Sequence, residues 1–365
     1  MKLARLVSLL AVVVLFLGGC ELLTAQDPAQ ERAANVVQSA PPPAAEVPED
    51  EPVARVASQV GPSVVQVNVE AIQLTPFGPQ SREGLGSGVI YREDGYIITN
   101  AHVVGDAGAV NVAFADGSTE RGEVVGTDPF TDLAVVRVDR NGLPAAAFAD
   151  SGEVVVGQLA VAIGSPSGFQ STVTSGVVSG LNREIPAEFT QGVQSPALVD
   201  LIQTDAAISP GSSGGALANR EGEVIGINVA YLPQTRSGAP VEGIGFAIPS
   251  TTAASVADQI IETGEAVHPF LGIAPVDLTP EIAERFGIPA DSGVIVAEVV
   301  PDSPADEAGL RREDVITAVD GTRIEGSGDL FAVLREYRPG DTVQLTVVRD
   351  GSEQTVELTL AERTS

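Results

Sequence analysis

The chain has 365 residues, of which 49 are Asp or Glu and 20 are Lys or Arg, so its formal net charge is −29. This length suggests two or three domains, and a hydrophobic fraction of 44% excludes a wholly disordered chain. An acidic surface repels phosphate backbones, so nucleic-acid binding is not expected. A single cysteine, Cys20, and two histidines, His102 and His268, exclude a disulfide framework and argue against a metal site, and no cofactor is expected.

The first twenty residues have the order of a secretion signal. Lys2 and Arg5 precede an apolar run over residues 6–17, which is shorter than the roughly 20 residues of a membrane-spanning helix. The end of this run, Leu17-Gly18-Gly19-Cys20, resembles the lipobox of bacterial lipoproteins, which implies cleavage before Cys20 and a lipid anchor on it. An ordinary signal peptide or an uncleaved anchor is the alternative. Each of these readings places the chain outside the cytoplasm, in the periplasm or at the cell surface.

Residues 20–53 are rich in Ala, Glu and Pro and have little to bury, so they are expected to form a disordered tether. Short strand-like segments separated by Gly, Asp-Gly and Pro then run to about residue 241, a pattern that favours a barrel or a sandwich. A helix is expected to follow, capped by Ser250 or Thr251 and ended by Gly264. The first folded body therefore covers residues 54–264.

A second body is expected over residues 267–362, as a small α+β module of five or six strands and two helices. One of these helices places Leu330, Phe331, Leu334 and Tyr337 on one face and is expected to stop near residues 339–340. The closing hairpin turns at Asp350-Gly351.

The first chemical signal is Ser213, in the segment Gly211-Ser212-Ser213-Gly214-Gly215. Glycines on both sides of a serine permit a tight turn with backbone N–H groups aimed inward. Acyl transfer needs a nucleophilic hydroxyl beside such donors. Gly-Ser clusters are most often ordinary loops, so the segment alone does not establish catalysis.

A serine hydroxyl becomes nucleophilic only beside a base, and the first body offers His102, just after an expected strand. The alternative is a hydrogen-bonded core histidine. The base also needs an orienting carboxylate, and Asp132 leads into an apolar strand where an unpaired charge would be costly. Competing acids are Asp128, Asp200 and Asp205, of which the first and the last are more typical of loop-bracing residues.

The chain order His102, Asp132, Ser213 is that of chymotrypsin-like proteases, and the surrounding segments resemble the HtrA/Deg family over about residues 54–362. The resembling segments are residues 86–88, 99–104, 131–135, 174–179, 203–208 and 243–249 in the first body, and 270–273, 303–310 and 314–316 in the second. The resemblance implies a mainly β fold: a chymotrypsin-like double β-barrel protease domain (54–264) followed by a small α+β PDZ domain (267–362).

The resemblance also implies roles for individual residues. His102 would deprotonate Ser213, Asp132 would hold the imidazole, and the backbone N–H groups of Gly211 and Ser213 would receive the oxyanion. The family usually has Asn at the positions that Ser209 and Ser212 occupy here. Activity is still expected, because backbone groups hold the oxyanion.

Specificity is also read from the resemblance. Ala207 would form the floor of the substrate pocket, and Ile208, Ile227 and Val229 would line its walls. No acid is placed there to bind a basic side chain, so small or medium apolar residues such as Val, Ala or Leu are expected before the scissile bond.

The resemblance therefore implies an extracytoplasmic bacterial serine endopeptidase that degrades misfolded or damaged proteins, assembles as a homotrimer and is anchored to a membrane by lipid. The PDZ domain would bind peptide C-termini at the loop Phe270-Leu271-Gly272-Ile273. A proteolytically silent or conditionally active chaperone or peptide-binding sensor is the alternative, and the PDZ domain could be a mere spacer.

Overall fold

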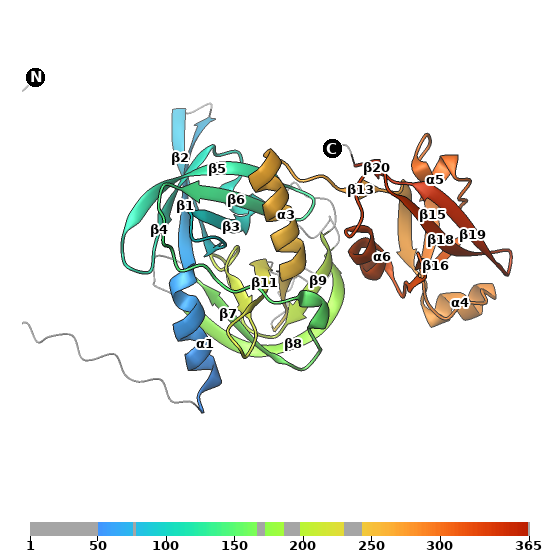
Figure 1. Cartoon of the computed structure of the whole chain (residues 1–365), viewed down its shortest axis with the longest axis horizontal. Helices are drawn as coiled ribbons and strands as arrows, with labels where there is room; N and C mark the ends of the chain where they lie inside the picture. Colours follow the sequence, from blue (N-terminus) through green and yellow to red (C-terminus); the bar gives the residue numbers. More distant parts are fainter. Residues whose placement is uncertain (1–49, 76–77, 166–171, 186–197, 230–242, 364–365) are drawn as a thin grey trace, which may run out of the picture. The chain divides into compact units, whose positions relative to one another are not determined.

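The computed structural model describes residues 50–75, 78–165, 172–185, 198–229 and 243–363 (Figure 1). The expected signal peptide at 1–19, the lipidation site Cys20 and nearly all of the expected tether lie outside these residues. Among the helices that are described, none combines the length and the apolar character that crossing a membrane would require.

The first folded body contains two closed antiparallel barrels of six strands each. In the first barrel, Val65, Val67 and Val69 alternate with less buried polar residues, which is the pattern that predicts a strand with one face in a core. This barrel closes in the order β1-β2-β3-β6-β5-β4. Its strands are β1 (Val64–Thr75), β2 (Gly78–Ile90), β3 (Tyr96–Asn100), β4 (Ala109–Ala113), β5 (Thr119–Asp128) and β6 (Leu133–Val138).

The second barrel closes in the order β10-β11-β12-β9-β8-β7. Its strands are β7 (Leu159–Gly164), β8 (Thr172–Ile185), β9 (Leu198–Thr204), β10 (Ala216–Ala218), β11 (Val224–Val229) and β12 (Gly245–Pro249). The predicted double barrel is confirmed, since short apolar strands separated by turns can close on themselves and leave no exposed edge.

The helices of this body are partly as expected. Helix α3 (Ser250–Thr263) ends at Gly264 with φ 89°, as predicted, but the predicted cap is wrong. The cap position is Pro249, and the Ser250 hydroxyl instead donates to the carbonyl of Ala149. Helix α1 (Pro52–Val60) was not predicted and begins inside the segment expected to be tether. Shorter pieces are α2 (Ala101–Val104) and the 3₁₀ turns at Gly61–Ser63 and Ser151–Glu153.

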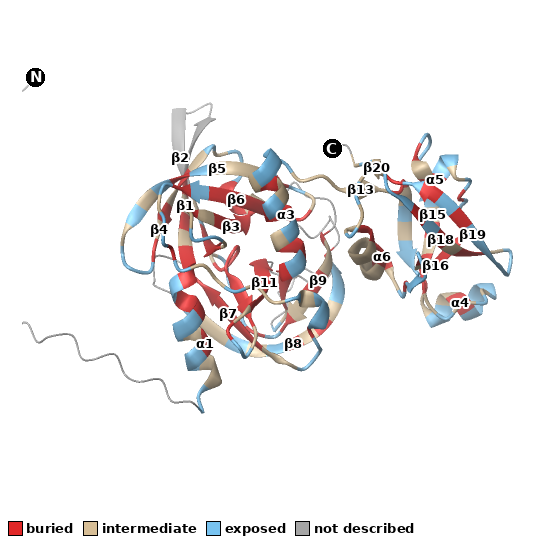
Figure 2. Cartoon of the chain, in the orientation of Figure 1, coloured by how far each residue is buried: buried red, intermediate tan, exposed pale blue. Residues whose placement is uncertain are grey.

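One hydrophobic cluster joins the two barrels. It takes Val89, Ile98 and Leu133 from the first barrel, Ile163 and Ile227 from the second, and further side chains from both helices, namely Val56, Val60, Val256, Ala257 and Ile260. The buried residues follow the strands of both barrels in Figure 2. This shared core packs the two barrels against each other. The loops at the junction between the barrels are therefore held in place.

The second folded body is an α+β domain with the sheet order β14-β15-β16-β18-β19. Its longer strands are β14 (Ile273–Asp277), β15 (Val294–Val299), β16 (Val315–Val319), β18 (Thr342–Arg349) and β19 (Ser352–Thr359), with short strands β13 (Pro269–Phe270), β17 (Thr322–Arg323) and β20 (Ala361–Glu362). Its helices are α4 (Pro280–Phe286), α5 (Pro304–Glu307) and α6 (Ser327–Leu334).

Two expectations for this domain were wrong. Helix α4 was missed, although Thr279 caps it by accepting from the Ile282 N–H and a proline opens it. Helix α6 ends at Leu334 rather than near residue 339. Tyr337 lies in the turn that follows, where its hydroxyl donates to Asp320 at 2.8 Å, and this contact competes with continuation of the helix.

Replacing Ile260 tests the junction between the barrels. Ile260 on α3 is 0% exposed, so Ile260→Ala should lower the free energy of unfolding by about 2–5 kcal/mol through lost burial and a cavity. Ile261→Ala, at a partly buried position on the same helix, should have a clearly smaller effect. Urea denaturation followed by circular dichroism measures both; equal losses would contradict the role of Ile260 in the shared core.

Candidate active site

His102 and Asp132 meet at the ends of two paired strands. Strands β3 and β6 pair with Asn100 opposite Leu133, so the chain leaves β3 into His102 close to where Asp132 leads into β6. The Nδ1 atom of His102 lies 2.7 Å from Oδ2 of Asp132, and the backbone N–H of His102 donates to Oδ1 at 3.0 Å. Asp132 is 0% exposed, so these bonds offset the burial of its charge.

The backbone of Asp132 is held in the same way. Its φ of 58° lies in the left-handed region, which Asp tolerates better than most residues. Its carbonyl accepts from the Ala101 N–H at 3.0 Å and from Nδ2 of Asn100 at 2.9 Å. Both the carboxylate and the backbone carbonyl of Asp132 are thus bonded to the segment that carries His102. A neutral imidazole that donates from Nδ1 has its lone pair on Nε2, where it can act as a base.

Ser213 lies in the second barrel, but its loop is attached to the first. Ser87 on β2 is 0% exposed: its N–H donates to the carbonyl of Ser213 at 2.7 Å and its hydroxyl donates to that of Gly211 at 2.7 Å. The Ser87 hydroxyl also accepts from the N–H of Ser165, at 2.8 Å. The carbonyl of Ser87 in turn accepts from the hydroxyl of Thr99 on β3, at 2.6 Å. The loop of Ser213 is therefore bonded to the strands that position His102. The sequence marks Ser87 only as part of the 86–88 motif, and its role as a clamp was missed.

Gly214 fits this loop because it lacks a side chain. Its φ is +81°, and an added Cβ would lie 2.2 Å from the carbonyl oxygen of Ser87 and 2.5 Å from Oγ1 of Thr99. Its N–H donates to the carbonyl of Asn228 on β11, at 2.9 Å. Both the backbone conformation and the contact with β2 thus require glycine beside the candidate nucleophile.

The structure separates Asp132 from its competitors. The carboxylate of Asp128 accepts from the Phe130 N–H and the Thr131 hydroxyl and pairs with Nε2 of His268 at 2.8 Å, so it braces the loop that leads to Asp132. Asp205 accepts from the N–H of Val177 at 2.7 Å. Asp200 lies within β9, where burial raises its pKa to about 6. The acid in contact with His102 is Asp132.

The expected pocket residues are spread over different environments. Ala207 is exposed and its carbonyl accepts from the Thr174 hydroxyl at 2.8 Å, while Ile208 is partly buried against the second barrel. Ile227 and Val229, on β11, belong to the core shared between the barrels. Their assignment to a substrate pocket stays a prediction.

The expected carboxylate-binding loop lies between β13 and β14. Leu271 is buried, and Gly272 has a φ of +90° with its carbonyl accepting from the N–H of Val300 at 2.8 Å. A Cβ on Gly272 would lie 2.1 Å from that of Ser303, which shows how tightly the loop is packed. Phe270 and Ile273 flank these two residues at intermediate exposure.

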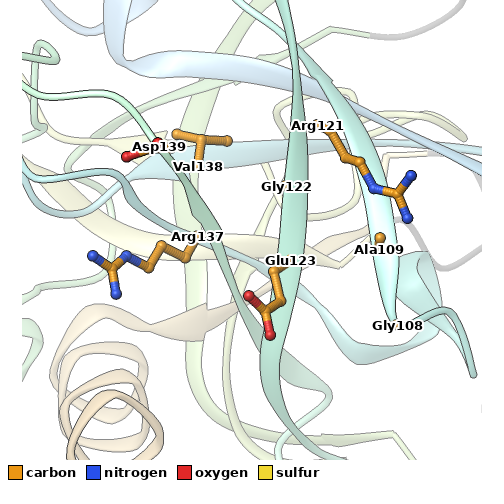
Figure 3. A pocket seen from close by; sticks show the side chains of 8 residues that line it. All are labelled: Gly108, Ala109, Arg121, Gly122, Glu123, Arg137, Val138 and Asp139. Carbon is orange, nitrogen blue, oxygen red and sulfur yellow. The ribbon is translucent and has the colours of Figure 1, made fainter.

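A surface hollow of about 600 Å³ lies away from these residues, on β4, β5 and β6 (Figure 3). Arg121, Glu123, Arg137 and Asp139 contribute mixed charges to it, and none of the three candidate catalytic residues lines it. Across the part of the chain that the structure describes, no three His, Cys, Asp or Glu side chains are arranged to hold a metal ion.

Comparison with known proteins agrees with both bodies. Residues 86–227 match the model of a trypsin-like peptidase domain, and residues 269–360 match that of a PDZ domain. The chain is 38% identical over 333 residues to "Serine protease Do-like HtrB" of Bacillus subtilis, covering 86% of this chain and 71% of that protein. A solved structure, "HtrA-type protease AlgW with decapeptide", superposes with a TM-score of 0.65 at 35% identity and covers 86% of this chain and 99% of its own. The chain belongs to the HtrA family of serine proteases.

Other HtrA relatives are longer than this chain. It is 40% identical over 314 residues to "Probable periplasmic serine endoprotease DegP-like" of Marinomonas sp., covering 84% of this chain but 65% of that protein. For the relative of the same description from Halomonas elongata, the identity is 42% over 283 residues, which cover 78% of this chain and 57% of that protein.

The need for glycine at position 214 can be measured against a matched glycine. Gly117 has nearly the same φ, +83°, but no atom within 4 Å of an added Cβ. Gly117→Ala should therefore cost about 1–2 kcal/mol of stability, from backbone strain alone. Gly214→Ala should lower the melting temperature much further, because the new methyl group also overlaps Ser87. Equal shifts in thermal unfolding would show that the contact with β2 is not constraining.

Proposed function

We propose that this chain is an extracytoplasmic serine endopeptidase that cleaves misfolded or damaged proteins. The observation that carries the proposal is the contact of His102 with the buried Asp132, together with the bonds by which Ser87 joins the loop of Ser213 to β3, the strand that leads into His102. The trypsin-like domain and the relatives described as serine proteases support the same reaction class.

In the proposed reaction, Nε2 of His102 takes the proton of the Ser213 hydroxyl as its oxygen attacks a peptide carbonyl. The Asp132 carboxylate, in contact with Nδ1 of His102, stabilises the imidazolium. The backbone N–H groups of Gly211 and Ser213 hold the oxyanion. His102 then gives its proton to the leaving amine, which departs and leaves an acyl-enzyme. Water then attacks that ester while His102 takes its proton; the bond between the acyl group and the Ser213 oxygen breaks, and His102 returns the proton to that oxygen.

The location and assembly of the protein are also proposals. Relatives described as periplasmic support an extracytoplasmic site of action. A signal peptide at 1–19, lipidation of Cys20 and a tether after it account for the charged, apolar and small residues at the start of the chain. We also propose a protease domain over 54–264, a PDZ domain over 267–362 and a homotrimer, and the matches to trypsin-like and PDZ domain models support the two-domain division.

The PDZ domain is proposed to bind the C-termini of substrates or signal peptides. Strand β14 is the end strand of its sheet, so an extended peptide can pair with the free side of β14. The loop of Leu271 and Gly272 leads into β14, where its amides can hold a terminal carboxylate. The solved structure of AlgW with a decapeptide supports peptide binding in a relative.

Digestion of casein, an unfolded substrate, tests the protease proposal. Ser213→Ala should reduce turnover by roughly 10⁶-fold, because it removes the nucleophile of a unit that acts together. Ser212→Ala is the matched control: it deletes the neighbouring hydroxyl and should leave turnover within a few-fold. The release of peptides is followed by mass spectrometry.

The two variants separate the alternatives. Loss in Ser212→Ala but not in Ser213→Ala would move the nucleophile by one residue. If the unaltered chain degrades neither casein nor casein supplemented with peptides that end in apolar residues, the chain is a chaperone or sensor rather than a protease. Activity that requires those peptides would identify a conditionally active protease.

The same digest tests the proposed pocket of Ala207, Ile208, Ile227 and Val229. Its floor and walls are apolar, so Val, Ala and Leu should be enriched immediately before the cleaved bonds. The sites are mapped from the peptide termini and compared with the composition of casein. Enrichment of Lys or Arg at that position would overturn the pocket assignment.

A further inference from the structure

The chain has two histidines, and each contacts an aspartate at one end of the same short turn. Strands β5 and β6 pair with each other, and residues 129–132 form the turn between them. Asp132 is the last residue of this turn and contacts His102. Asp128 is the last residue of β5, and its Oδ2 lies 2.8 Å from Nε2 of His268. Both histidines therefore act on one connection of the chain.

The carboxylate of Asp128 is bonded to two residues of the turn. Its Oδ1 accepts from the N–H of Phe130 at 3.1 Å, and its Oδ2 accepts from the hydroxyl of Thr131. A carboxylate accepts hydrogen bonds, so Nε2 of His268 is the donor of a third bond, which comes from outside the turn. Asp128 is 2% exposed, and a buried carboxylate is costly unless it is hydrogen-bonded. His268 therefore helps to keep this carboxylate buried against the turn.

His268 is brought to the turn by the close packing of α3 against β5. An added Cβ on Gly126 would lie 2.3 Å from the carbonyl oxygen of Gly264, at the end of α3. Strand and helix are thus in contact two residues before β5 ends. The N–H of Val267 donates to the side chain of Gln259 on α3 at 3.1 Å, which holds the connection against the helix. His268 follows directly, so its position is set by elements of the first folded body.

The orientation of the His268 ring is restricted by further contacts. It meets the ring of Phe130 edge to face, with the two centroids 5.5 Å apart. The guanidinium of Arg363 lies 4.5 Å from the centroid of the Phe130 ring. The backbone N–H of Arg363 donates to the carbonyl of His268 at 2.9 Å. The His268 side chain is 13% exposed, so its bond to the turn is formed with little freedom of the ring.

We propose that His268 is a positioning residue for Asp132, and that it acts through its bond to Asp128. The inference rests on the proposed protease function, in which Asp132 orients His102. Asp132 has a φ of 58°, a conformation that persists only where its surroundings determine it. Without the Nε2 donor of His268, the Asp128 carboxylate moves toward water and the turn relaxes. Asp132 is then no longer held in its position against His102.

Three variants of the full chain separate the donor from the ring. His268→Gln keeps an N–H at about the position of Nε2 and should behave as the unaltered chain does. His268→Asn carries the same amide on a side chain one methylene shorter, which does not reach Asp128. His268→Phe keeps a ring against Phe130 but has no donor. Tyr91→Phe is the matched control, because it removes one side-chain bond to an aspartate, Asp258 on α3, at the hairpin between β2 and β3.

The first measurement is the cleavage of an internally quenched peptide, copied from a casein fragment and amidated at its C-terminus. His268→Phe and His268→Asn should lower kcat by about 10–100-fold and leave KM within about twofold, because the geometry of the base changes and substrate binding does not. The fall is partial, since residues 100–102 still bond to Asp132. Thermal unfolding of each variant checks that it is folded.

The second measurement does not depend on activity. With ¹⁵N-labelled histidine, the chain gives NMR signals from two imidazoles. The proton on Nδ1 of His102 resonates at low field when it is bonded to the carboxylate of Asp132. In His268→Phe and His268→Asn this signal should move upfield and exchange faster with water. In His268→Gln and Tyr91→Phe it should stay unchanged.

The outcomes distinguish this inference from the proposed function. If the unaltered chain cleaves nothing, the proposed function fails, and the NMR signal alone decides the inference. The inference is overturned if folded His268→Phe and His268→Asn keep both kcat and the signal, or if kcat falls while the signal is unchanged.

Two further outcomes would overturn the role of the Nε2 donor. One is that His268→Gln is as impaired as His268→Asn, because the bond to Asp128 would then not be what positions the turn. The other is that all three variants of His268 fail to fold, because the residue would then serve the fold as a whole. Absence of the low-field signal from the unaltered chain would overturn the contact of His102 with Asp132, and with it the inference.

Discussion

The clamp between Ser87 and the loop of Ser213 is the interaction on which the candidate active site depends. The first barrel holds His102 and Asp132, and the second holds Ser213, so no single barrel contains the whole set. Ser87 bonds to the loop through its N–H and its hydroxyl, and its carbonyl is bonded to Thr99. The hydrophobic cluster beneath these bonds keeps the barrels from separating. The hydrogen bonds of Ser87 thus position the loop of Ser213 against the strands of the first barrel, and apolar packing holds the two barrels together.

The site also concentrates unusual backbone geometry. Asp132, Gly211 and Gly214 all have positive φ, and the strain at Asp132 is sustained by bonds from three consecutive residues, Asn100 to His102. Such conformations persist only where the surroundings determine them. The conformation of these loops is consequently determined by their contacts with the barrels rather than by the intrinsic backbone preferences of their residues.

Most of the architecture could be predicted from local pattern. Alternation in β1 and the β2–β3 hairpin, where Val89 pairs with Ile98, follow from periodicity and turn residues. The His102–Asp132 contact agrees with the order of the family, which adds long-range information that spacing alone lacks. The sequence-based predictions failed where a tertiary contact overrides the local preference of the sequence. The Ser250 hydroxyl donates a hydrogen bond to the carbonyl of Ala149 instead of capping its own helix. Helix α1 is stabilised because Val56 and Val60 are buried in the core between the barrels, which the sequence pattern does not reveal. The role of Ser87 was equally hidden, because a buried serine between glycines has no distinctive signal until its partners are known.

The helices at the two ends of the first body, α1 and α3, insert into the same cluster between the barrels. Val56 and Ile260 are both 0% exposed there, although some two hundred residues of chain separate them. Contacts so distant in sequence form slowly, because a long loop must close before they stabilise anything. During synthesis, the barrel junction is therefore completed only when α3 has emerged. The nascent chain consequently passes most of its elongation with His102 and Ser213 not yet fixed in their final register.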